Sequence, residues 1–194
     1  GNDEELFTMD ELIKLFDINK VHKGGAKFDP EKNKWFNHQY LQRQDNEALA
    51  KELSHTLLEN GINKPIEDVT KIVGLVKERA HFTTELWSLS DYFFVAPESY
   101  DEKAAKKQWK ENTGEIMAEL ATVLQNTLDF SSENTEKVTK DWINEKELGM
   151  GKVMAPLRLS VVGELKGPHL FDIMELIGKE ETISRINKAV ETLS

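Results

Sequence analysis

The chain has no cysteine among its 194 residues, which excludes disulfide bonds, a thiolate nucleophile and a thiolate metal site. No apolar run approaches the ~20 residues that a membrane-spanning helix needs. The N-terminal stretch GNDEELFT is acidic and lacks the pattern of a signal peptide. We therefore expect a cytoplasmic protein with no membrane partner. Hydrophobic residues make up 39% of the chain. That fraction is below the ~45–50% typical of compact domains, and it favours an elongated shape.

The usual sequence signals of a catalytic or metal site are also missing. The two glycine pairs, Gly24-Gly25 and Gly149-x-Gly151, lack the strand context and fuller pattern of a phosphate-binding loop. No serine lies in a Gly-x-Ser-x-Gly elbow, and no carboxylate pair stands out as an acid and base. We predict no catalytic residue and no metal site. The histidines show no i,i+4 pair of the kind that binds zinc on a helix, and they are His22, His38, His55, His81 and His169.

The charge balance argues against general binding to nucleic acid. The net charge is −10, whereas such binding depends on neutralising phosphates with cations. Acidic residues gather in 3–5, 98–119 and 133–147, while residues 151–170 contain only one acid, Glu164. This asymmetry would confine RNA to one face, although a solvated surface is the alternative for each basic cluster. The clusters are Lys152, Arg158 and Lys166, followed by Lys179, and Lys20, His22, Lys23 and Lys27.

Helical signals dominate the sequence and predict the all-α class. Thr8 and Glu11 have capping-box spacing, and they predict a helix that buries Leu12, Ile13, Leu15 and Phe16. Asp29-Pro30 fits the cap and first residue of a helix carrying Trp35, Phe36, Tyr40 and Leu41. Further helices are expected over 46–60, from Pro65 to 76, from Thr84 to 93, and at about 101–111, 114–129 and 133–147.

Residues 151–193 predict three short apolar helices separated by glycine and proline. Pro168 fits the first position of the second helix, and Gly178 fits its end. The turn from Lys166 to His169 therefore presents a helix N-terminus with unpaired N–H donors beside a cation, which suits an acceptor-rich ligand. The third helix is expected to bury Ile183, Ile186, Val190 and Leu193, whose spacing marks one helix face.

Three ordered blocks of this chain resemble bacterial glutamyl-tRNA synthetases. The first is GGAKFD followed by Trp35, Asn37 and Tyr40, and the second is YFFVAPESYD. The third runs GKVMAPLR, then Gly-x-Leu, then GPHLF, and ends in IGKE. The resemblance spans nearly the whole chain and corresponds to the C-terminal, anticodon-binding end of that family. It implies an elongated helical bundle or cage of the class I anticodon-binding type.

The resemblance also implies what the chain does. The family's catalytic motifs, of the His-Ile-Gly-His and Lys-Met-Ser-Lys-Ser kinds, do not occur in this sequence. We therefore expect a fragment that recognises glutamate tRNA without catalysing, from a glutamate–tRNA ligase whose other half binds ATP and magnesium. The fragment itself is expected to need no cofactor, to be monomeric, and to contact its own catalytic domain in the longer chain. The sequence leaves open whether the enzyme accepts glutamate tRNA alone or both glutamate and glutamine tRNA.

The family's subdomains imply three parts here. Residues 1–45 would end the stem-contact region, 46–98 would form an anticodon-stem-binding subdomain, and 99–194 would form an anticodon-loop-binding subdomain. Composition changes near 44–46 and 96–100 agree with these boundaries.

The resemblance assigns anticodon contacts to Arg158, Gly167, Pro168, His169 and Leu170, with Arg79 as a looser match. It assigns contacts with the tRNA backbone to Lys27, Lys152 and Lys166. A guanidinium can bond a base edge with two donors, glycine permits close approach, and leucine can pack against a base.

Each assignment has a simpler alternative. Arg158 could form an ion pair with Glu164 or Asp172, Leu170 could pack in the core, and Arg79 could be an exposed helix charge. Trp35 and Tyr40 are expected to be core residues. His169 departs from the family pattern, and it could stack on a base or reflect local sequence drift. For the whole chain, the alternative is an α-helical protein-interaction scaffold with no RNA partner.

Overall fold

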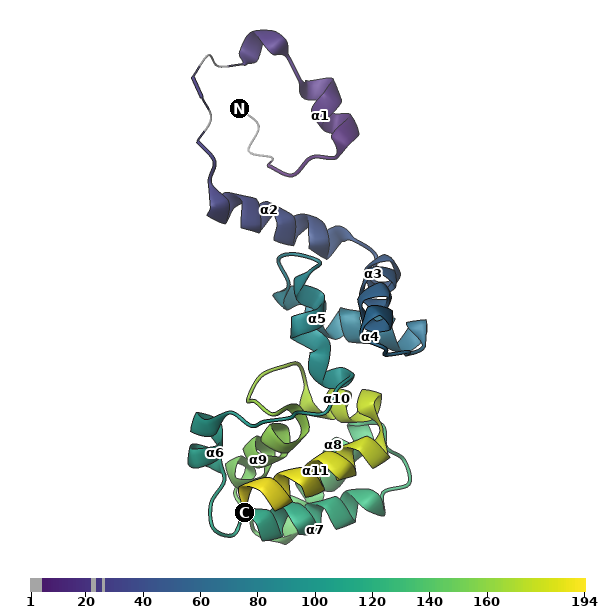
Figure 1. Ribbon diagram of the computed structural model, residues 1–194, viewed down its shortest axis with the longest axis vertical. Coiled ribbons are helices and arrows are strands. Elements are labelled where there is room, and N and C mark those ends of the chain that lie inside the picture. Colours follow the sequence, from purple (N-terminus) through teal and green to yellow (C-terminus); the bar gives the residue numbers. More distant parts are fainter. Residues whose placement is uncertain (1–4, 22–23, 26) are drawn as a thin grey trace.

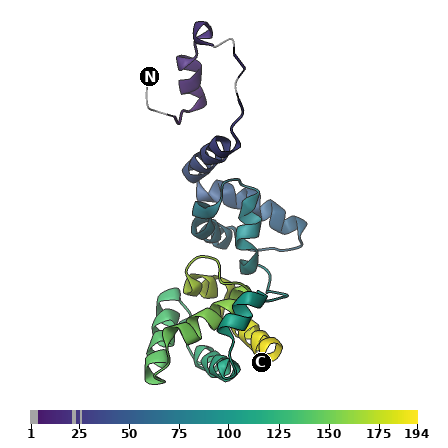
Figure 2. The same ribbon diagram turned by 90° about the vertical axis from the view of Figure 1, so that its left-hand side faces the viewer.

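The structure is a computed structural model that describes residues 5–21, 24–25 and 27–194. Those residues contain eleven α-helices and three short 3-10 helices and no strand, which confirms the predicted all-α class. The molecule is elongated (Figure 1), and a view turned by 90° shows the same order of parts along the long axis (Figure 2). Among the described residues, none of the helices combines the length and apolar character needed to cross a bilayer.

The helices follow one another along the chain with short connections. The α-helices are α1 (Met9–Leu15), α2 (Pro30–Arg43), α3 (Asn46–Glu59), α4 (Ile66–Val76), α5 (Glu85–Ser90), α6 (Glu102–Gln108), α7 (Thr113–Gln125), α8 (Ser132–Glu145), α9 (Met150–Val162), α10 (Leu170–Ile177) and α11 (Lys179–Leu193). The 3-10 helices are η1 (Ile18–Lys20), η2 (Lys77–Arg79) and η3 (Asp91–Phe93).

Helix starts lie where side chains can accept the free N–H groups of a first turn. The Asp29 carboxylate accepts bonds of 3.0 and 3.1 Å from the backbone of Glu31 and Lys32. Thr8 and Glu11 form the predicted capping box at the start of α1. Gly178 ends α10 with φ +88°, a conformation that favours glycine. These local signals explain why the predicted helices form close to their expected positions.

Helices α3, α4 and α5, with η2 and η3, form what we call the middle unit, residues 46–93. Leu49, Leu53 and Leu57 recur every four residues on α3, and all are buried against α4. The facing side chains of α4 are spaced for one helix face, as the sequence predicts, and they are Val69, Ile72, Val73 and Val76.

Helices α6 to α11 form what we call the C-terminal unit, residues 102–193. Here α11 packs along both α7 and α9, and α10 packs on α8. Pro156 lies inside α9 and does not divide it, so α9 is one continuous helix. The buried residues of the two units form one hydrophobic cluster. The domain boundaries near 45 and 98 remain a prediction.

The N-terminal arm, residues 5–28, does not bury the apolar face that its sequence predicts. No residue of α1 is buried, and Leu12, Ile13, Leu15 and Phe16 are all exposed. Periodicity correctly predicts the helix, but in the described structure no other element packs against that face. The expected burial of these four residues is therefore wrong for this chain.

Two further expectations about burial are also wrong. Trp35 is 41% exposed and Tyr40 is 39% exposed, so neither is a core residue. Tyr40 instead donates its hydroxyl to the carbonyl of Phe7 at 2.8 Å, which ties the N-terminal arm to α2. On α11 the buried face differs from the predicted one. Ile186 is buried as expected, but the other buried residues of this helix are Thr182, Arg185 and Ala189. Ile183, Val190 and Leu193 are only partly buried.

Candidate nucleic-acid interface

The connection between α9 and α10, residues 163–169, is the centre of the candidate site, and we call it the α9–α10 loop. Gly163 ends α9 in the left-handed conformation, with φ +85°. Its carbonyl accepts a 2.8 Å bond from the backbone N–H of Asp101, at the start of α6. Gly167 also has positive φ, +100°. Two glycines therefore give the loop its turns, and the junction before α6 fixes where it begins.

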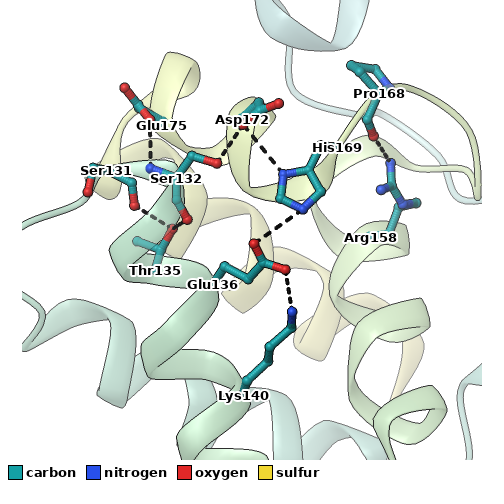
Figure 3. A network of polar contacts seen from close by, with 10 residues as sticks. All are labelled: Ser131, Ser132, Thr135, Glu136, Lys140, Arg158, Pro168, His169, Asp172 and Glu175. Atoms are coloured by element: carbon teal, nitrogen blue, oxygen red, sulfur yellow. Dashed lines mark hydrogen bonds and ion pairs between the residues drawn. The ribbon is translucent and has the colours of Figure 1, made fainter.

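Arg158 lies one turn before the end of α9 and points its guanidinium at this loop. Its Nη1 donates to the carbonyls of Lys166 and Pro168, each at 2.9 Å (Figure 3 shows the bond to Pro168). The alternative of an ion pair with Glu164 or Asp172 is not found among the described residues. Burial is the main cause of a lowered pKa for Arg158, although an arginine remains charged near neutral pH.

Arg79 reaches the same loop from the middle unit. It is the last residue of η2, and its Nη2 donates to the carbonyl of Gly167 at 3.1 Å. Arg79 is thus more than an exposed helix charge, since it contacts a residue 88 positions away. Two arginines from different units therefore hold three consecutive carbonyls, those of Lys166, Gly167 and Pro168.

Tyr92 forms the floor under this loop. Its side chain is only 4% exposed, and burial raises its pKa to about 12, against the opposing effect of nearby Arg79. A Cβ on Gly167 would lie 3.0 Å from the Tyr92 hydroxyl, so the loop backbone is pressed against the ring. Beside it is a cavity of about 350 Å³ between the two units. The cavity is lined by Arg79, Ser88, Leu89, Tyr92, Lys166 and Gly167.

The sequence did not identify three of these lining residues as site residues. Tyr92 opens the aromatic block YFFVAPESYD, and Ser88 and Leu89 belong to no motif. They become part of the site because α5 and η3 pack beneath a loop more than 70 residues further along the chain. No local spacing could have indicated that contact, since it depends on how the two units pack.

One predicted contact and one predicted helix position need correction. Leu170 is the first residue of α10, and it is 1% exposed in the core. Its side chain therefore offers no surface to a base. Leu170 packs in the core instead, which was the simpler alternative for this residue. Pro168 does not occupy the first helical position, because the helix cap is His169 and α10 begins at Leu170. Pro168 contributes its carbonyl to Arg158 instead.

His169 is exposed and lies between two carboxylates (Figure 3). Its Nδ1 is 3.4 Å from Asp172 Oδ1, and its Nε2 is 3.6 Å from Glu136 Oε2. The hydrogen bond from Lys140 is the main cause of a lowered pKa for Glu136, and His169 lowers it further. Ser132 Oγ also donates to Asp172 at 2.5 Å. This acidic network connects the start of α10 to α8, and its negative charge would repel phosphate on that side of the loop.

The predicted backbone-binding lysines are spread over the molecule. Lys166 is in the loop, exposed and 3.1 Å from Glu164, an ion pair of the exposed kind that contributes little. Lys152 is exposed near the start of α9, and Lys27 is exposed in the N-terminal arm. Lys179 lies beyond the other end of α10, about 12 Å along the helix from the loop. Only Arg158 and Lys166 of the predicted cluster meet at the loop, with Arg79 as the third cation.

His22 and Lys23 lie outside the described residues. Within the described residues, no group of three or more histidines or carboxylates could hold a metal ion. The α9–α10 loop itself presents cations and backbone N–H groups above the Tyr92 ring.

A comparison with protein families matches residues 38–190 to the family described as the anticodon binding domain. Among individual proteins, the chain is 61% identical over 193 residues to a glutamate–tRNA ligase of Flavobacterium johnsoniae, and 58% identical to one of Flavobacterium psychrophilum. Each match covers 100% of this chain and 38% of the relative.

Solved structures of glutamate–tRNA ligases also match this chain. The crystal structure of a glutamate tRNA ligase from Elizabethkingia meningosepticum, in complex with its amino acid, matches with a TM-score of 0.92 and 54% identity. The glutamate-tRNA synthetase of Elizabethkingia anophelis matches with a TM-score of 0.84 and 52% identity. This chain spans 38% and 37% of those two chains.

Proposed function

Because the chain belongs to the anticodon-binding domain family, we propose that it reads the anticodon loop of glutamate tRNA as the C-terminal part of a glutamate–tRNA ligase. The observation that carries this proposal is the convergence of Arg79 and Arg158 on the α9–α10 loop, beside a cavity with an aromatic floor. Anticodon bases are unstacked, so a protein can bond their edges and pack against their faces.

The loop supplies donors for such base edges. For the backbone N–H groups of Lys166, Gly167 and His169, no partner occurs within the described residues. Arg158 uses Nη1 for the loop carbonyls, and its Nε and Nη2 groups make no hydrogen bond in the same part of the chain. These groups offer several donors within one small region, and a base edge rich in acceptors would satisfy them.

The cavity supplies a place for a base or sugar. Leu89 gives it a partly exposed apolar surface, and Ser88 adds a hydroxyl, above the buried Tyr92 ring that the loop covers. Packing of a base against Leu89 would contribute affinity without sequence preference. Sequence preference would then come from the loop donors, and the exposed Lys166 would contact phosphate.

The net charge of −10 limits where RNA can approach. Cations from two units meet at the loop, whereas carboxylates of α8 and α10 surround His169 on the other side. The negative surfaces would repel phosphates and so orient the RNA on the protein. Affinity for tRNA should accordingly be weaker and more specific than that of a generally basic domain.

Glutamate activation belongs, under this proposal, to the part of such ligases that the chain does not cover. ATP and magnesium would bind there, and the residues described here would bind tRNA without catalysing. The exposed apolar side chains of the N-terminal arm suit a contact with that part of the longer polypeptide. We take the protein to be a monomer of the cytoplasm, where translation takes place.

The comparisons give no support to the alternative function, an α-helical protein-interaction scaffold with no RNA partner. The matching family binds anticodons by its description, and the relatives reported above are glutamate–tRNA ligases. Among the described residues, half of the exposed large apolar side chains lie in the N-terminal arm, and Leu165 is the one that lies in the α9–α10 loop.

The test is a binding measurement with two RNAs at one ionic strength. One is a glutamate tRNA transcript, and the other is the same transcript with its anticodon bases replaced. We expect the replacement to weaken binding by at least about fivefold, since a good base contact discriminates by roughly 1–3 kcal/mol. Equal affinity for the two RNAs would rule out anticodon reading.

A further inference from the structure

The α9–α10 loop is held by arginines on both sides before any RNA binds. Arg158 Nη1 bonds the carbonyls of Lys166 and Pro168, and Arg79 Nη2 bonds the carbonyl of Gly167 between them. The two arginines come from α9 and from η2, which belong to different units. The acceptors of three consecutive peptide groups are therefore occupied within the protein.

The support under the loop is itself fixed. Arg185 on α11 is 2% exposed, and its Nη1 donates to the carbonyl of Tyr92 at 2.6 Å and to that of Val161 at 2.8 Å. Tyr92 in turn lies directly beneath Gly167. The loop thus rests on an anchored ring and is held along its backbone by Arg158. Arg79 provides the one hydrogen bond to the loop that comes from the middle unit among the described residues.

We propose that Arg79 is a positioning residue for base reading, which acts through the carbonyl of Gly167 and not only through its own charge. With this carbonyl bonded, the carbonyls of residues 166–169 all have partners, and the unengaged backbone groups of this stretch are the N–H groups of Lys166, Gly167 and His169, for which the described residues supply no partner. Without Arg79, Gly167 would present a free acceptor beside those donors. The inference rests on the proposed function, because it concerns how the loop selects a base.

The chemical consequence is a preference for base edges that present acceptors. A reading edge made only of donors matches carbonyl oxygens and ring nitrogens of a base. It opposes an exocyclic amino group, because two donors would then face each other without a partner. Arg79 therefore sharpens discrimination between a carbonyl and an amino group at the base that the loop reads.

The first arm of the test needs no RNA. The chain has no cysteine, so Leu165→Cys in the loop, where the side chain is 44% exposed, gives one site for a spin label. We expect Arg79→Ala to raise the mobility of that label and to shift the ratio of held to released loop by roughly fivefold. Lys71→Ala on α4 removes an exposed cation of the same unit, and it should leave the spectrum unchanged.

A second variant acts on the other partner of the same contact. Gly167→Ala forces a Cβ toward the Tyr92 hydroxyl and strains a backbone with φ +100°. Moving the Gly167 backbone away from Tyr92 also moves its carbonyl away from Arg79. Gly167→Ala should therefore mobilise the label as Arg79→Ala does, and the double variant should exceed the larger single effect only slightly. An unchanged label spectrum in Arg79→Ala, or fully additive effects of the two changes, would overturn the positioning role.

The second arm uses glutamate tRNA transcripts in which a base carbonyl is exchanged for an amino group at each anticodon position in turn. At the position that the loop reads, Arg79→Ala should reduce discrimination about fivefold or more, while Lys71→Ala should not. A uniform loss for all transcripts would show a charge effect and contradict the proposal. If the label is mobilised but no transcript binds selectively even to the unaltered chain, the proposed function fails and the loop contact stands.

Discussion

Arg158 and Pro168 are joined by a 2.9 Å hydrogen bond, in which the guanidinium donates to the backbone carbonyl. A second bond of equal length connects the same Nη1 to Lys166. The side chain assigned to base reading therefore also shapes the loop beside it. Loss of Arg158 would remove a donor for RNA and release two carbonyls of the loop at once. Its effect on affinity should then depend on whether the loop has a base to read.

The first prediction concerns the start of that loop. Gly163→Ala should destabilise the fold by about 2–3 kcal/mol, because alanine is strained at φ +85° and its Cβ would lie 2.8 Å from Pro97 and 3.0 Å from the Ser99 carbonyl. Urea unfolding followed by circular dichroism measures the change.

Gly151→Ala is the matched control for this prediction. Gly151 lies in α9 with open space around its Cβ position. Alanine there should increase the free energy of unfolding by about 0.5 kcal/mol, because it has the higher helix propensity. Equal effects from the two substitutions would show that Gly163 has no special conformational role.

The second prediction concerns alkaline pH. Burial raises the pKa of Tyr92 to about 12, above the ~10 of a tyrosine in an unfolded chain. The folded state therefore prefers the neutral ring. This contribution is complete below about pH 10 and is lost as the pH rises toward 12. Tyr92→Phe should flatten the fall of stability between about pH 10 and about pH 12, and urea unfolding at those pH values measures it.

Tyr40→Phe serves as the comparison, since Tyr40 is half-exposed on α2. Tyr100, whose pKa burial also raises, remains in both variants and gives a common background. If both substitutions changed the pH dependence equally, burial of Tyr92 could not be its cause.

The sequence predicts most of the helices because their ends are determined locally. Asp29 caps α2 and Gly178 ends α10 where the residue types require it. Burial is predicted less well, because it depends on neighbours far along the chain. The apolar residues of α1 have helical spacing, yet Ile13 and Phe16 are each 67% exposed.

The candidate site shows the same limit. Arg158 and Gly167 lie in one short segment, and the sequence identifies that segment as important. Tyr92 comes from the middle unit, and Arg79 could be linked to the loop only through a loose resemblance. Leu170 follows the helix cap directly, so its apolar side chain turns into the core rather than toward a ligand.

The third prediction is catalytic silence. The sequence contains neither of the ATP-handling motifs of the class I ligases, so the isolated chain should show no glutamate-dependent exchange of pyrophosphate into ATP, with or without tRNA. Radiolabelled exchange assays measure this. Exchange that co-purifies with the chain would contradict its role as a binding region.

The fourth prediction concerns Lys166, which is exposed and forms an ion pair with Glu164. Lys166→Ala should weaken cognate and anticodon-substituted tRNA by the same factor. It should also reduce the slope of log affinity against log salt by about one ion, as expected for a phosphate contact. Lys107→Ala on α6, another exposed lysine outside the loop, is the control and should leave that slope unchanged.

The most direct test of the account is the affinity of Arg158→Ala for two RNAs, a glutamate tRNA and the same RNA with its anticodon replaced. Binding to the cognate RNA should lose roughly 1–3 kcal/mol. Binding to the substituted RNA should change much less, because the contact that Arg158 supports is already absent there. Loss by the same factor for both RNAs would contradict anticodon reading by Arg158 and the α9–α10 loop.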